Sequence, residues 1–284
     1  LRDRLTSVVR FKKPSIYKTP DELRAMVRPG LLTAEALDAV RAAIRPGITT
    51  GELDAIAERT IRDGGGVPNF QLVPGYRHTL CVSVNDEIVH GIPGERVLAP
   101  GDIVSVDAGA EVDGWNGDSA FTTVVPGGDA AVAAARQTLC DTTERSLWHG
   151  IAALAHAKNL HEVGSAVEDA IDETGAWGIV EDYTGHGIGR SMHEDPPVFN
   201  YRVRGAGPAV KPGLVVAIEP MVTAGAIDSS TDDDEWTVRT LDGSDAAHWE
   251  HSVAVHAAGI WVLTAADGGA RGLAPLGVTP VPIP

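Results

Sequence analysis

Cysteine is scarce in this sequence, and long apolar stretches are missing from it. Its 284 residues include two cysteines, Cys81 and Cys140, which are too few for a disulfide framework and fit a reducing compartment. The sequence has no cysteine pair with zinc-site spacing and no apolar run of about 18 residues, so it predicts neither a thiolate zinc site nor a membrane span. It also shows no charged-then-apolar leader of the secretory kind. We therefore expect a cytoplasmic protein.

Positive charge is also in short supply. Lysine and arginine number 23 against 39 acidic residues, so the formal net charge is −16, which argues against DNA binding by the body of the protein. Residues 1–18 differ, because they carry six cations and a single aspartate. We interpret this arm as a solvated tail, and a phosphate-binding arm is the alternative.

Capping residues mark the starts of two N-terminal helices. Thr19 stands three residues before Glu22, and Thr49 stands three residues before Glu52; both patterns are typical of a helix N-terminus. Apolar residues with helical spacing follow each start. Pro29-Gly30 interrupts the first pattern, so we expect either a kink there or two separate helices.

The rest of the chain alternates helical stretches with short strand-like segments. Helical spacing recurs at 129–149 and 160–173, and strand-like segments lie at 80–84, 103–109, 116–125, 178–183, 214–219, 236–239 and 252–255. Several positions of the second helix match residues 110 places later, a faint repeat that favours two related halves. From residue 266 on, glycine and proline predict a flexible or surface-wrapped tail.

Two aspartates on a predicted hairpin give the first chemical signal. Asp107 ends an apolar strand, Asp118 lies on the returning strand, and Asp113-Gly114 between them is a two-residue turn signal. That turn sets Asp118 opposite Gly109, so the two aspartates become diagonal neighbours roughly 7 Å apart at the backbone. Two buried like charges need a cation to neutralise them. The alternative is two exposed aspartates beside a turn, and a register shift of one residue would also separate them.

Three further side chains complete a set of metal ligands. Glu219 ends an apolar run, Glu250 stands just before a predicted strand, and His186 lies in the glycine-rich run Gly185–Gly189. A carboxylate inside an apolar run must be paired or coordinated, whereas His186 alone fits a surface-loop histidine equally well. Four carboxylates and one imidazole suit Mn²⁺, Fe²⁺, Co²⁺ or Zn²⁺ and carry more charge than one ion balances, so we expect two ions. The predicted ligands are Asp107, Asp118, His186, Glu219 and Glu250.

Short motifs in a fixed order give the chain a family resemblance. These motifs are Val89–Pro93, Ser105–Gly109, Gly114–Asp118, Gly185–Gly189, Met192-His193, Ile218–Met221, Asp234–Val238 and His248–His251. On these motifs the chain resembles a type I methionine aminopeptidase, from about residue 16 to residue 264. All of them in order, with the five ligands present, make a specific combination.

The resemblance implies both a fold and a function. The fold is the pita-bread fold, an α+β architecture of two pseudo-symmetric halves of helices and antiparallel strands around a dinuclear metal site. The function is removal of the initiator methionine from nascent proteins when the second residue is small, by attack of a metal-bound hydroxide. By position, Asp107 would bind one ion, His186 and Glu219 would bind the other, and Asp118 and Glu250 would bridge the two.

The resemblance also assigns catalytic and substrate-binding roles. Glu219 would accept and return the proton of the water, His193 would hydrogen-bond the scissile carbonyl, and His90 would bond the amide nitrogen side of that peptide. A satisfied core histidine is the alternative for His90. The implied methionine pocket is lined by Phe70, Tyr76, Cys81 and Trp236. Aromatic rings with a soft thiol suit a flexible thioether, although a lone Cys81 also fits a plain core cysteine.

Three residues near this pocket depart from the family pattern. Val73 stands where an aromatic residue is common, Arg77 where proline is common, and Met192 where phenylalanine is often found. These departures concern the shape of the pocket and access to it, and they leave the metal ligands unchanged.

The resemblance leads us to expect one catalytic domain over residues 16–264, and composition marks a basic N-terminal extension at 1–15 and a Gly/Pro-rich tail at 265–284. Its cofactors are two divalent metal ions (Mn, Fe, Co or Zn), and its partners are N-terminal Met peptides of nascent proteins. We expect a monomer, weak ribosome association through the basic arm, and no DNA or membrane partner. Two alternatives are an X-Pro aminopeptidase or prolidase-like hydrolase of the same fold, and a non-catalytic pita-bread binding module that would lack ligands.

Overall fold

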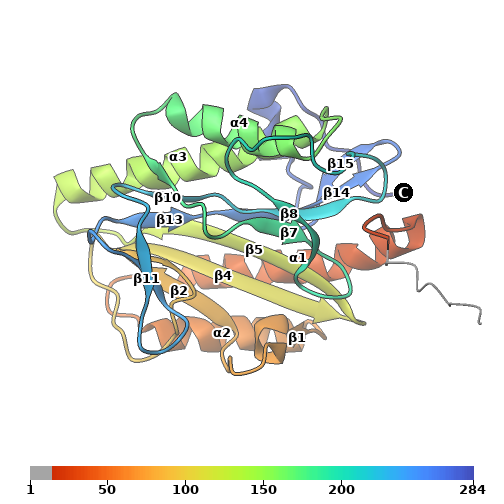
Figure 1. Ribbon diagram of the computed structural model, residues 1–284. Helices are drawn as coiled ribbons and strands as arrows, with labels where there is room; N and C mark the ends of the chain where they lie inside the picture. Colours follow the sequence, from red (N-terminus) through yellow and green to blue (C-terminus); the bar gives the residue numbers. More distant parts are fainter. Residues whose placement is uncertain (1–14) are drawn as a thin grey trace, which may run out of the picture.

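The structure is a computed structural model that describes residues 15–284 (Figure 1). The predicted basic extension therefore lies almost wholly outside the described residues. The helices are α1 (Pro20–Ala43), α2 (Thr50–Asp63), α3 (Ala130–Leu154), α4 (His161–Asp172) and α5 (Ala270–Leu273), with 3₁₀ turns at Asn69–Leu72 and Ala274–Leu276. The long helices α1 and α3 pack against the main sheet, α2 lies beside α1, and α4 lies beside α3.

Both predicted helix starts are confirmed, each as a capping box. Thr19 caps α1 and Thr49 caps α2, and in each case the glutamate three residues later bonds back to the cap. The prediction of two separate helices around Pro29 is wrong, because α1 continues through this residue. Pro29 and the following glycine are buried, and Gly30 lies against the backbone of Leu263 with no room for a Cβ atom. Tertiary packing thus outweighs the helix-breaking tendency of proline here.

One large antiparallel sheet carries most of the predicted site. Its hydrogen-bonded path runs β1-β4-β5-β14-β9-β7-β8, and β2 and β15 pair with β4 and β14. The strands are β1 (Val67–Pro68), β2 (Leu80–Val84), β4 (Ile103–Val112), β5 (Trp115–Val124), β7 (Gly185–Gly187), β8 (Glu194–Val198), β9 (Val215–Ile218), β14 (Glu250–His256) and β15 (Gly259–Val262). Figure 1 shows the long β4–β5 hairpin across the middle of the molecule.

Two small antiparallel sheets stand beside the main one. The first joins β13 (Ala246–His248), β10 (Met221–Thr223) and β6 (Gly178–Ile179), and the second joins β11 (Ser229–Thr231), β12 (Val238–Thr240) and β3 (Glu87–Val89). Segments expected as longer strands at 178–183 and 236–239 are shorter here, since β6 ends at Ile179 and β12 begins at Val238. The bounds of these short strands depend on pairing partners far away in the sequence. A local sequence pattern carries no information about those partners.

The predicted hairpin register is confirmed. Asp113 and Gly114 form the turn with φ angles of 53° and 73°, and Gly109 faces Asp118 across the ladder. Positive φ at both central residues is the requirement of a type I′ turn, which aspartate followed by glycine meets at low cost. Because this turn sets the pairing, it also places Asp107 and Asp118 on one face of the ribbon.

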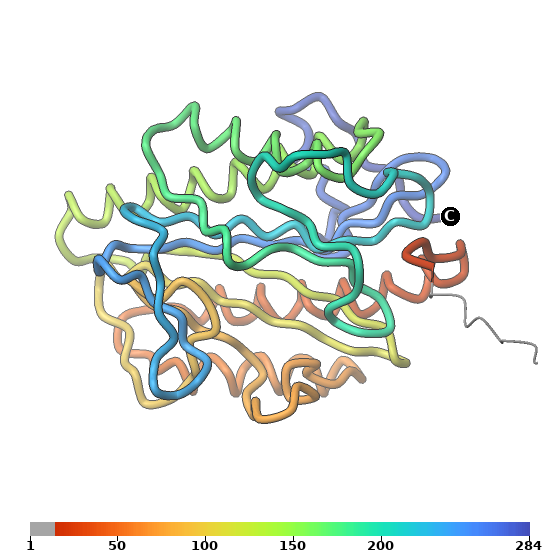
Figure 2. The backbone as a smooth tube through the Cα atoms, viewed as in Figure 1, coloured from red at the N-terminus to blue at the C-terminus, as the bar shows by residue number. Residues whose placement is uncertain are grey.

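The C-terminal residues after β15 pack back onto the body of the protein. Val281 pairs with β15 through a 2.9 Å hydrogen bond from its amide to the Ile260 carbonyl, and Val278 is buried. Figure 2 shows the C-terminus beside the first described residues, and the Arg24 guanidinium donates to the Pro284 carbonyl at 2.8 Å.

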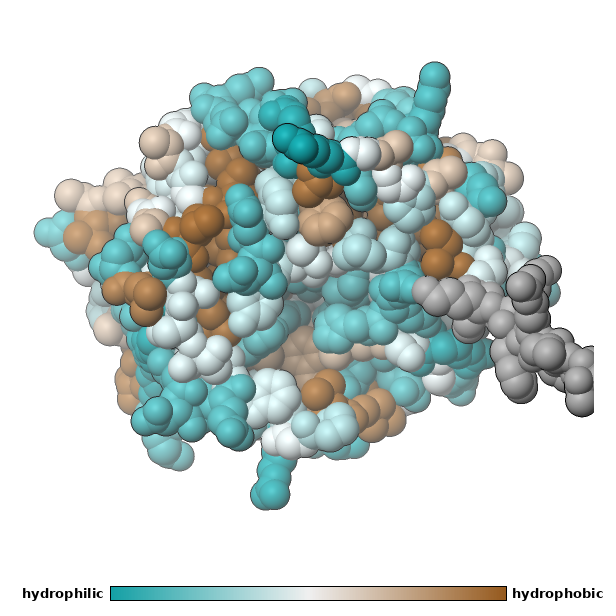
Figure 3. Space-filling model, in the orientation of Figure 1, coloured by the Kyte–Doolittle hydropathy of each residue, from teal (hydrophilic) through white to brown (hydrophobic). Residues whose placement is uncertain are grey.

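The face seen in Figure 3 is largely hydrophilic, with apolar residues in separate small groups. Within residues 15–284, each helix is too short or too polar to cross a membrane.

Candidate metal centre

The five predicted ligands line one cavity. Asp107 lies on β4, Asp118 on β5, His186 on β7 and Glu250 at the start of β14, while Glu219 follows directly after β9. The cavity has a volume of about 290 Å³, and all five side chains contribute to its wall. Residues spread over more than a hundred positions of the sequence therefore meet at one place.

Strand register brings the carboxylates together. Ala120 of β5 faces Asp107 of β4 on one side and Glu250 of β14 on the other, so both acids lie in one row across the three strands. Asp118 lies on β5, two residues before Ala120. His251 pairs with Ile218, and the same register continued by one residue sets Glu219 opposite Glu250. Alternate residues of a strand share a face, and here that face carries four acids.

The ligand atoms form overlapping groups of three. Atoms of Asp107, Asp118 and Glu250 lie within 4.8 Å of one another, and so do atoms of His186, Glu219 and Glu250. The two groups share Glu250 and together include all five predicted ligands. His186 Nε2 also lies 3.4 Å from Glu219 Oε1 and 4.0 Å from Asp118 Oδ2. These five side chains would together hold two divalent ions.

The buried acids leave hydrogen-bonding capacity unused. Burial raises the pKa of Asp107 and of Glu219 to about 7, and burial together with neighbouring carboxylates raises the pKa values of Asp118 and Glu250 well above their usual range. One oxygen each of Asp107, Asp118 and Glu250 is buried with no hydrogen-bond partner among residues 15–284. Clustered carboxylates with free oxygens are unfavourable unless a cation neutralises them. The donor set therefore fits divalent metal ions.

His186 has the tautomer that a metal ligand needs. Its Nδ1–H donates to the Gly187 carbonyl at 2.9 Å, and burial lowers its pKa, which favours the neutral ring. The lone pair is then left on Nε2, the atom that faces Glu219 and Asp118. A backbone carbonyl that holds the other ring nitrogen is the usual way of orienting a histidine ligand.

The two predicted catalytic histidines lie at the same cavity. The ring of His193 stands edge-on to that of His186 with centroids 4.4 Å apart, and His90 follows β3 with a φ of 60° and its ring edge-on to Tyr183. Burial lowers the pKa of His90 to about 4, with a smaller effect of His248. Burial and His90 likewise lower the pKa of His193. Both rings are therefore neutral near pH 7 and able to donate one hydrogen bond each.

The predicted methionine-pocket residues form the apolar end of the cavity. The cluster consists of Phe70, Tyr76 and Cys81, with Val73, Ile92, Met192 and Trp236 packed against it. The Tyr76 ring lies 4.9 Å from that of Trp236 and 6.4 Å from that of Phe70. Its hydroxyl donates to the Leu80 carbonyl at 2.6 Å, so the Tyr76 ring is fixed in place. An apolar slot thus adjoins the acidic cluster.

Comparison with known proteins agrees with this geometry. The sequence matches metallopeptidase family M24 over residues 24–257. The chain belongs to this family. A Bacillus subtilis relative named methionine aminopeptidase 1 is 43% identical over 249 residues, which cover 88% of this chain and 98% of that protein. A Mycobacterium tuberculosis relative of the same name is 46% identical over 253 residues, which cover 87% of this chain and 94% of that protein.

Solved structures of methionine aminopeptidases share the fold of this M24 chain. The methionine aminopeptidase of Rickettsia prowazekii superposes with a TM-score of 0.82 at 32% identity, covering 88% of this chain and 99% of that one. The prolidase of Pyrococcus furiosus superposes with a TM-score of 0.63 at 21% identity and is covered over 65% of its length, which shows a shared fold alone. The predicted pita-bread α+β fold is confirmed, and the M24 chain is a metallopeptidase that uses divalent metal ions.

Sequence reasoning missed several residues of the M24 cavity. Tyr183 and Thr184 lie outside the motifs of the resemblance, and Val89, Met221 and His248 lie within them without an assigned role in the cavity. His248 ends β13 and is buried, and its Nε2 lies 3.6 Å from Glu219 Oε2. Nothing in the local spacing separates it from His251, whose ring turns the other way, toward Trp148 and Thr264.

The three departures from the family pattern have different positions in the structure. Val73 and Met192 line the cavity and pack against the apolar cluster. Arg77 is exposed and is not part of the wall. Two of the three departures therefore concern the slot itself.

Proposed function

We propose that this protein releases the N-terminal methionine of peptides and nascent proteins whose second residue is small. The observation that carries this proposal is the junction of two unlike surfaces in one cavity, an acidic metal-binding cluster and a slot of aromatic rings with a buried thiol. Relatives named methionine aminopeptidase, 39–46% identical over most of the chain, support the same activity.

Five residues would hold the metal. Asp107, Asp118, His186, Glu219 and Glu250 would ligate two divalent ions, which when bound supply a Lewis acid for the scissile carbonyl and acidify a water. Manganese, iron, cobalt and zinc each suit carboxylate and imidazole donors.

The chain's own groups would then handle protons and orientation. The Glu219 carboxylate lies between His186 and His248, a position from which it would accept the proton of the attacking water and return it to the leaving amine. His193 would donate to the carbonyl oxygen of the scissile peptide, where negative charge develops. His90, at the same cavity beside Tyr183, would bond the amide nitrogen side of the same peptide.

The apolar slot would select the methionine side chain. Phe70, Tyr76 and Trp236 offer ring faces and edges, and a thioether makes favourable contacts with aromatic rings. The Cys81 thiol donates to Tyr76 Oη at 3.3 Å, and burial holds its pKa well above the usual range. Cys81 would thus act as a neutral part of the wall.

The cellular setting is part of the same proposal. We propose a monomeric, cytoplasmic enzyme that meets its substrates as they leave the ribosome, with weak ribosome association through the basic arm. Lys18 is not available for this contact, because it pairs with Glu194 at 2.6 Å and its side chain is 7% exposed. Deleting residues 1–14 should therefore lower co-sedimentation with ribosomes and leave peptide hydrolysis unchanged. Equal co-sedimentation of the full and shortened chains would refute the role of the arm.

The activity is tested with a small set of peptides. The chelator-treated protein should hydrolyse Met-Ala-Ser once Mn²⁺, Fe²⁺, Co²⁺ or Zn²⁺ is restored, each tested alone, and it should act far more slowly on Met-Leu-Ser. Preferential hydrolysis of Ala-Pro-Ala would instead support the X-Pro peptidase alternative. Absence of turnover with all four metals would support a non-catalytic binding module.

A further inference from the structure

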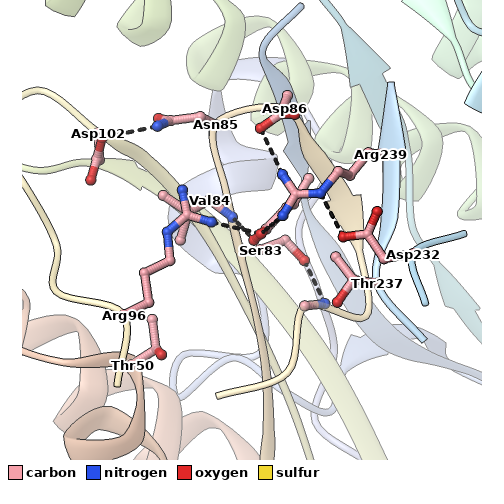
Figure 4. Close-up of polar contacts among 12 residues, drawn as sticks. Thr50, Ser83, Val84, Asn85, Asp86, Arg96, Asp102, Asp232, Thr237 and Arg239 are labelled. Atoms are coloured by element: carbon pink, nitrogen blue, oxygen red, sulfur yellow. Dashed lines mark hydrogen bonds and ion pairs between the residues drawn. The ribbon is translucent and has the colours of Figure 1, made fainter. Parts of the chain in front are cut away.

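The Arg239 guanidinium lies outside the cavity and links two segments that line it, one with His90 and one with Trp236. Arg239 on β12 donates to three carboxylates, from Nη1 to Asp86 at 3.0 Å, from Nη2 to Glu87 at 2.6 Å and from Nε to Asp232 at 2.7 Å. Figure 4 shows its side chain between Asp86 and Asp232. The planar, multidentate donor group of arginine suits such a site, whereas the single ammonium of lysine does not.

Two of these acids belong to the segment that leads to His90. Glu87 starts β3, Val89 ends it, and His90 follows directly. Arg239 pairs with Glu87 and Val238 pairs with Val89 in the ladder between β12 and β3. The side-chain bonds of Arg239 therefore reinforce the strand that positions His90.

Glu87 is also fixed from its other side. It is buried, accepts from Arg96 Nη1 at 2.6 Å and receives the Val84 amide at 2.7 Å. A buried carboxylate held by two guanidinium groups and one amide does not depend on Arg239 alone. Loss of the bond between Arg239 and Asp232 should thus leave Glu87 and the strand that leads to His90 in place.

The third acid belongs to the turn that carries Trp236. The Asp232 amide donates to the Thr237 carbonyl at 2.8 Å, and Asp234 Oδ1 accepts from the amides of Trp236 and Thr237, each at 2.8 Å. Residues 232–237 are therefore a closed turn. The Trp236 ring on this turn meets Tyr76 in the apolar slot, so any movement of the turn changes the width of that slot.

We propose that Arg239, acting through Asp232, is a positioning residue that fixes Trp236 relative to His90 and so sets the fit of the methionine side chain. This inference rests on the proposed function and adds a residue pair that determines specificity. Loss of the Asp232 bond should loosen one wall of the slot and leave the acidic cluster intact. The consequence is weaker binding of substrate, with the chemical step preserved.

The test uses Asp232→Asn, which keeps the size of the side chain and removes its charge. We expect its KM for Met-Ala-Ser to rise about five- to tenfold, the effect of weakening one charge-assisted hydrogen bond, with kcat within about twofold. Binding of free methionine, followed by calorimetry, should weaken by a similar factor. Arg239→Gln should have a larger effect on KM than Asp232→Asn, and Arg239→Lys should restore part of the loss.

Glu173→Gln is the matched control. It removes a carboxylate that pairs with Arg145 of α3 at 2.5 Å, outside the cavity wall, and its KM should stay at the wild-type value. If Asp232→Asn has a lower melting temperature but unchanged KM and methionine affinity, the Arg239–Asp232 pair contributes only to stability. That result would overturn the inference. Failure of the wild-type protein to release methionine would instead overturn the proposed function, so the two failures are distinguishable.

Discussion

The carboxylate of Glu219 lies between two imidazoles, with His186 Nε2 3.4 Å from Oε1 and His248 Nε2 3.6 Å from Oε2. His248 is buried, and its Nε2 has no hydrogen-bond partner within the described part of the chain. Its backbone is held firmly, since its amide donates to Thr122 Oγ1 at 2.9 Å. A buried imidazole nitrogen with no other partner among residues 15–284, 3.6 Å from the Glu219 carboxylate, indicates a group that orients this carboxylate.

Replacing His248 by alanine should therefore slow catalysis without abolishing it. Groups that orient a metal ligand contribute about 10- to 100-fold to activity or metal affinity, and we expect a fall of that size in kcat and in affinity for Mn²⁺. Steady-state kinetics and equilibrium dialysis measure the two effects. The exposed His156 supplies the control, because its alanine variant should match wild type in both. An unchanged kcat and metal affinity in the His248 variant would argue against the orienting role.

Gly109 is a position where the site tolerates no side chain. A Cβ atom there would lie 2.2 Å from Asn69 Oδ1 and 2.4 Å from Asn69 Nδ2, and Asn69 is itself held by Asn116 and the Gly117 carbonyl. Gly109 also faces Asp118 across the ladder. Gly109→Ala should destabilise the protein by about 2 kcal/mol, as overpacking of a buried site does, and should lower metal affinity because Asp118 is displaced.

Gly94→Ala is the companion change for this experiment. An added Cβ at Gly94 meets no atom of residues 15–284 within 4 Å, so its free energy of unfolding should stay within about 0.5 kcal/mol of wild type. Urea denaturation of both variants gives the comparison. Equal stabilities of the two variants would show that Asn69 moves aside freely.

The paired aspartates could be predicted because one local signal fixes their geometry. Aspartate followed by glycine allows a two-residue turn, the turn sets the register, and the register places Asp107 and Asp118 on one face. His248 and Tyr183 could not be found in this way. His248 ends a three-residue strand whose partner, β10, is known only once the chain has folded, and Tyr183 lies in a loop after the short strand β6.

Pro29 shows the opposite limit of local patterns. Its sequence context indicates an interrupted helix, yet α1 continues through it. The Thr33 hydroxyl donates to the Pro29 carbonyl at 3.0 Å, and the adjacent Gly30 fits closely against Leu263 and Gly117. Contacts from residues about 90 and 230 positions later therefore decide the local structure.

Cys81 should prove dispensable for the chemical step. Burial keeps the pKa of its thiol well above the usual range, so the thiolate required of a nucleophile is not present. Cys81→Ala should retain kcat within about threefold and raise KM by a few fold, because it removes packing from the slot and one weak hydrogen bond to Tyr76 Oη and leaves the metal ligands in place. Peptide kinetics at saturating metal measure both values. A drop in kcat of more than about 100-fold would point to covalent catalysis by the cysteine instead.

Asp118 should couple metal binding to stability. An ion that binds only the folded state adds about 2.7 kcal/mol at a concentration 100 times its dissociation constant, which for a chain of this size corresponds to a rise of about 5 °C or more in melting temperature. Chelator-treated wild type should show that rise when Mn²⁺ is restored, and Asp118→Asn should lose it together with peptide hydrolysis. Asp113→Asn changes an exposed aspartate at the tip of the same hairpin and should keep the full rise. If Asp118→Asn is stabilised by Mn²⁺ as strongly as Asp113→Asn, the ions bind elsewhere and the proposed ligand set is wrong.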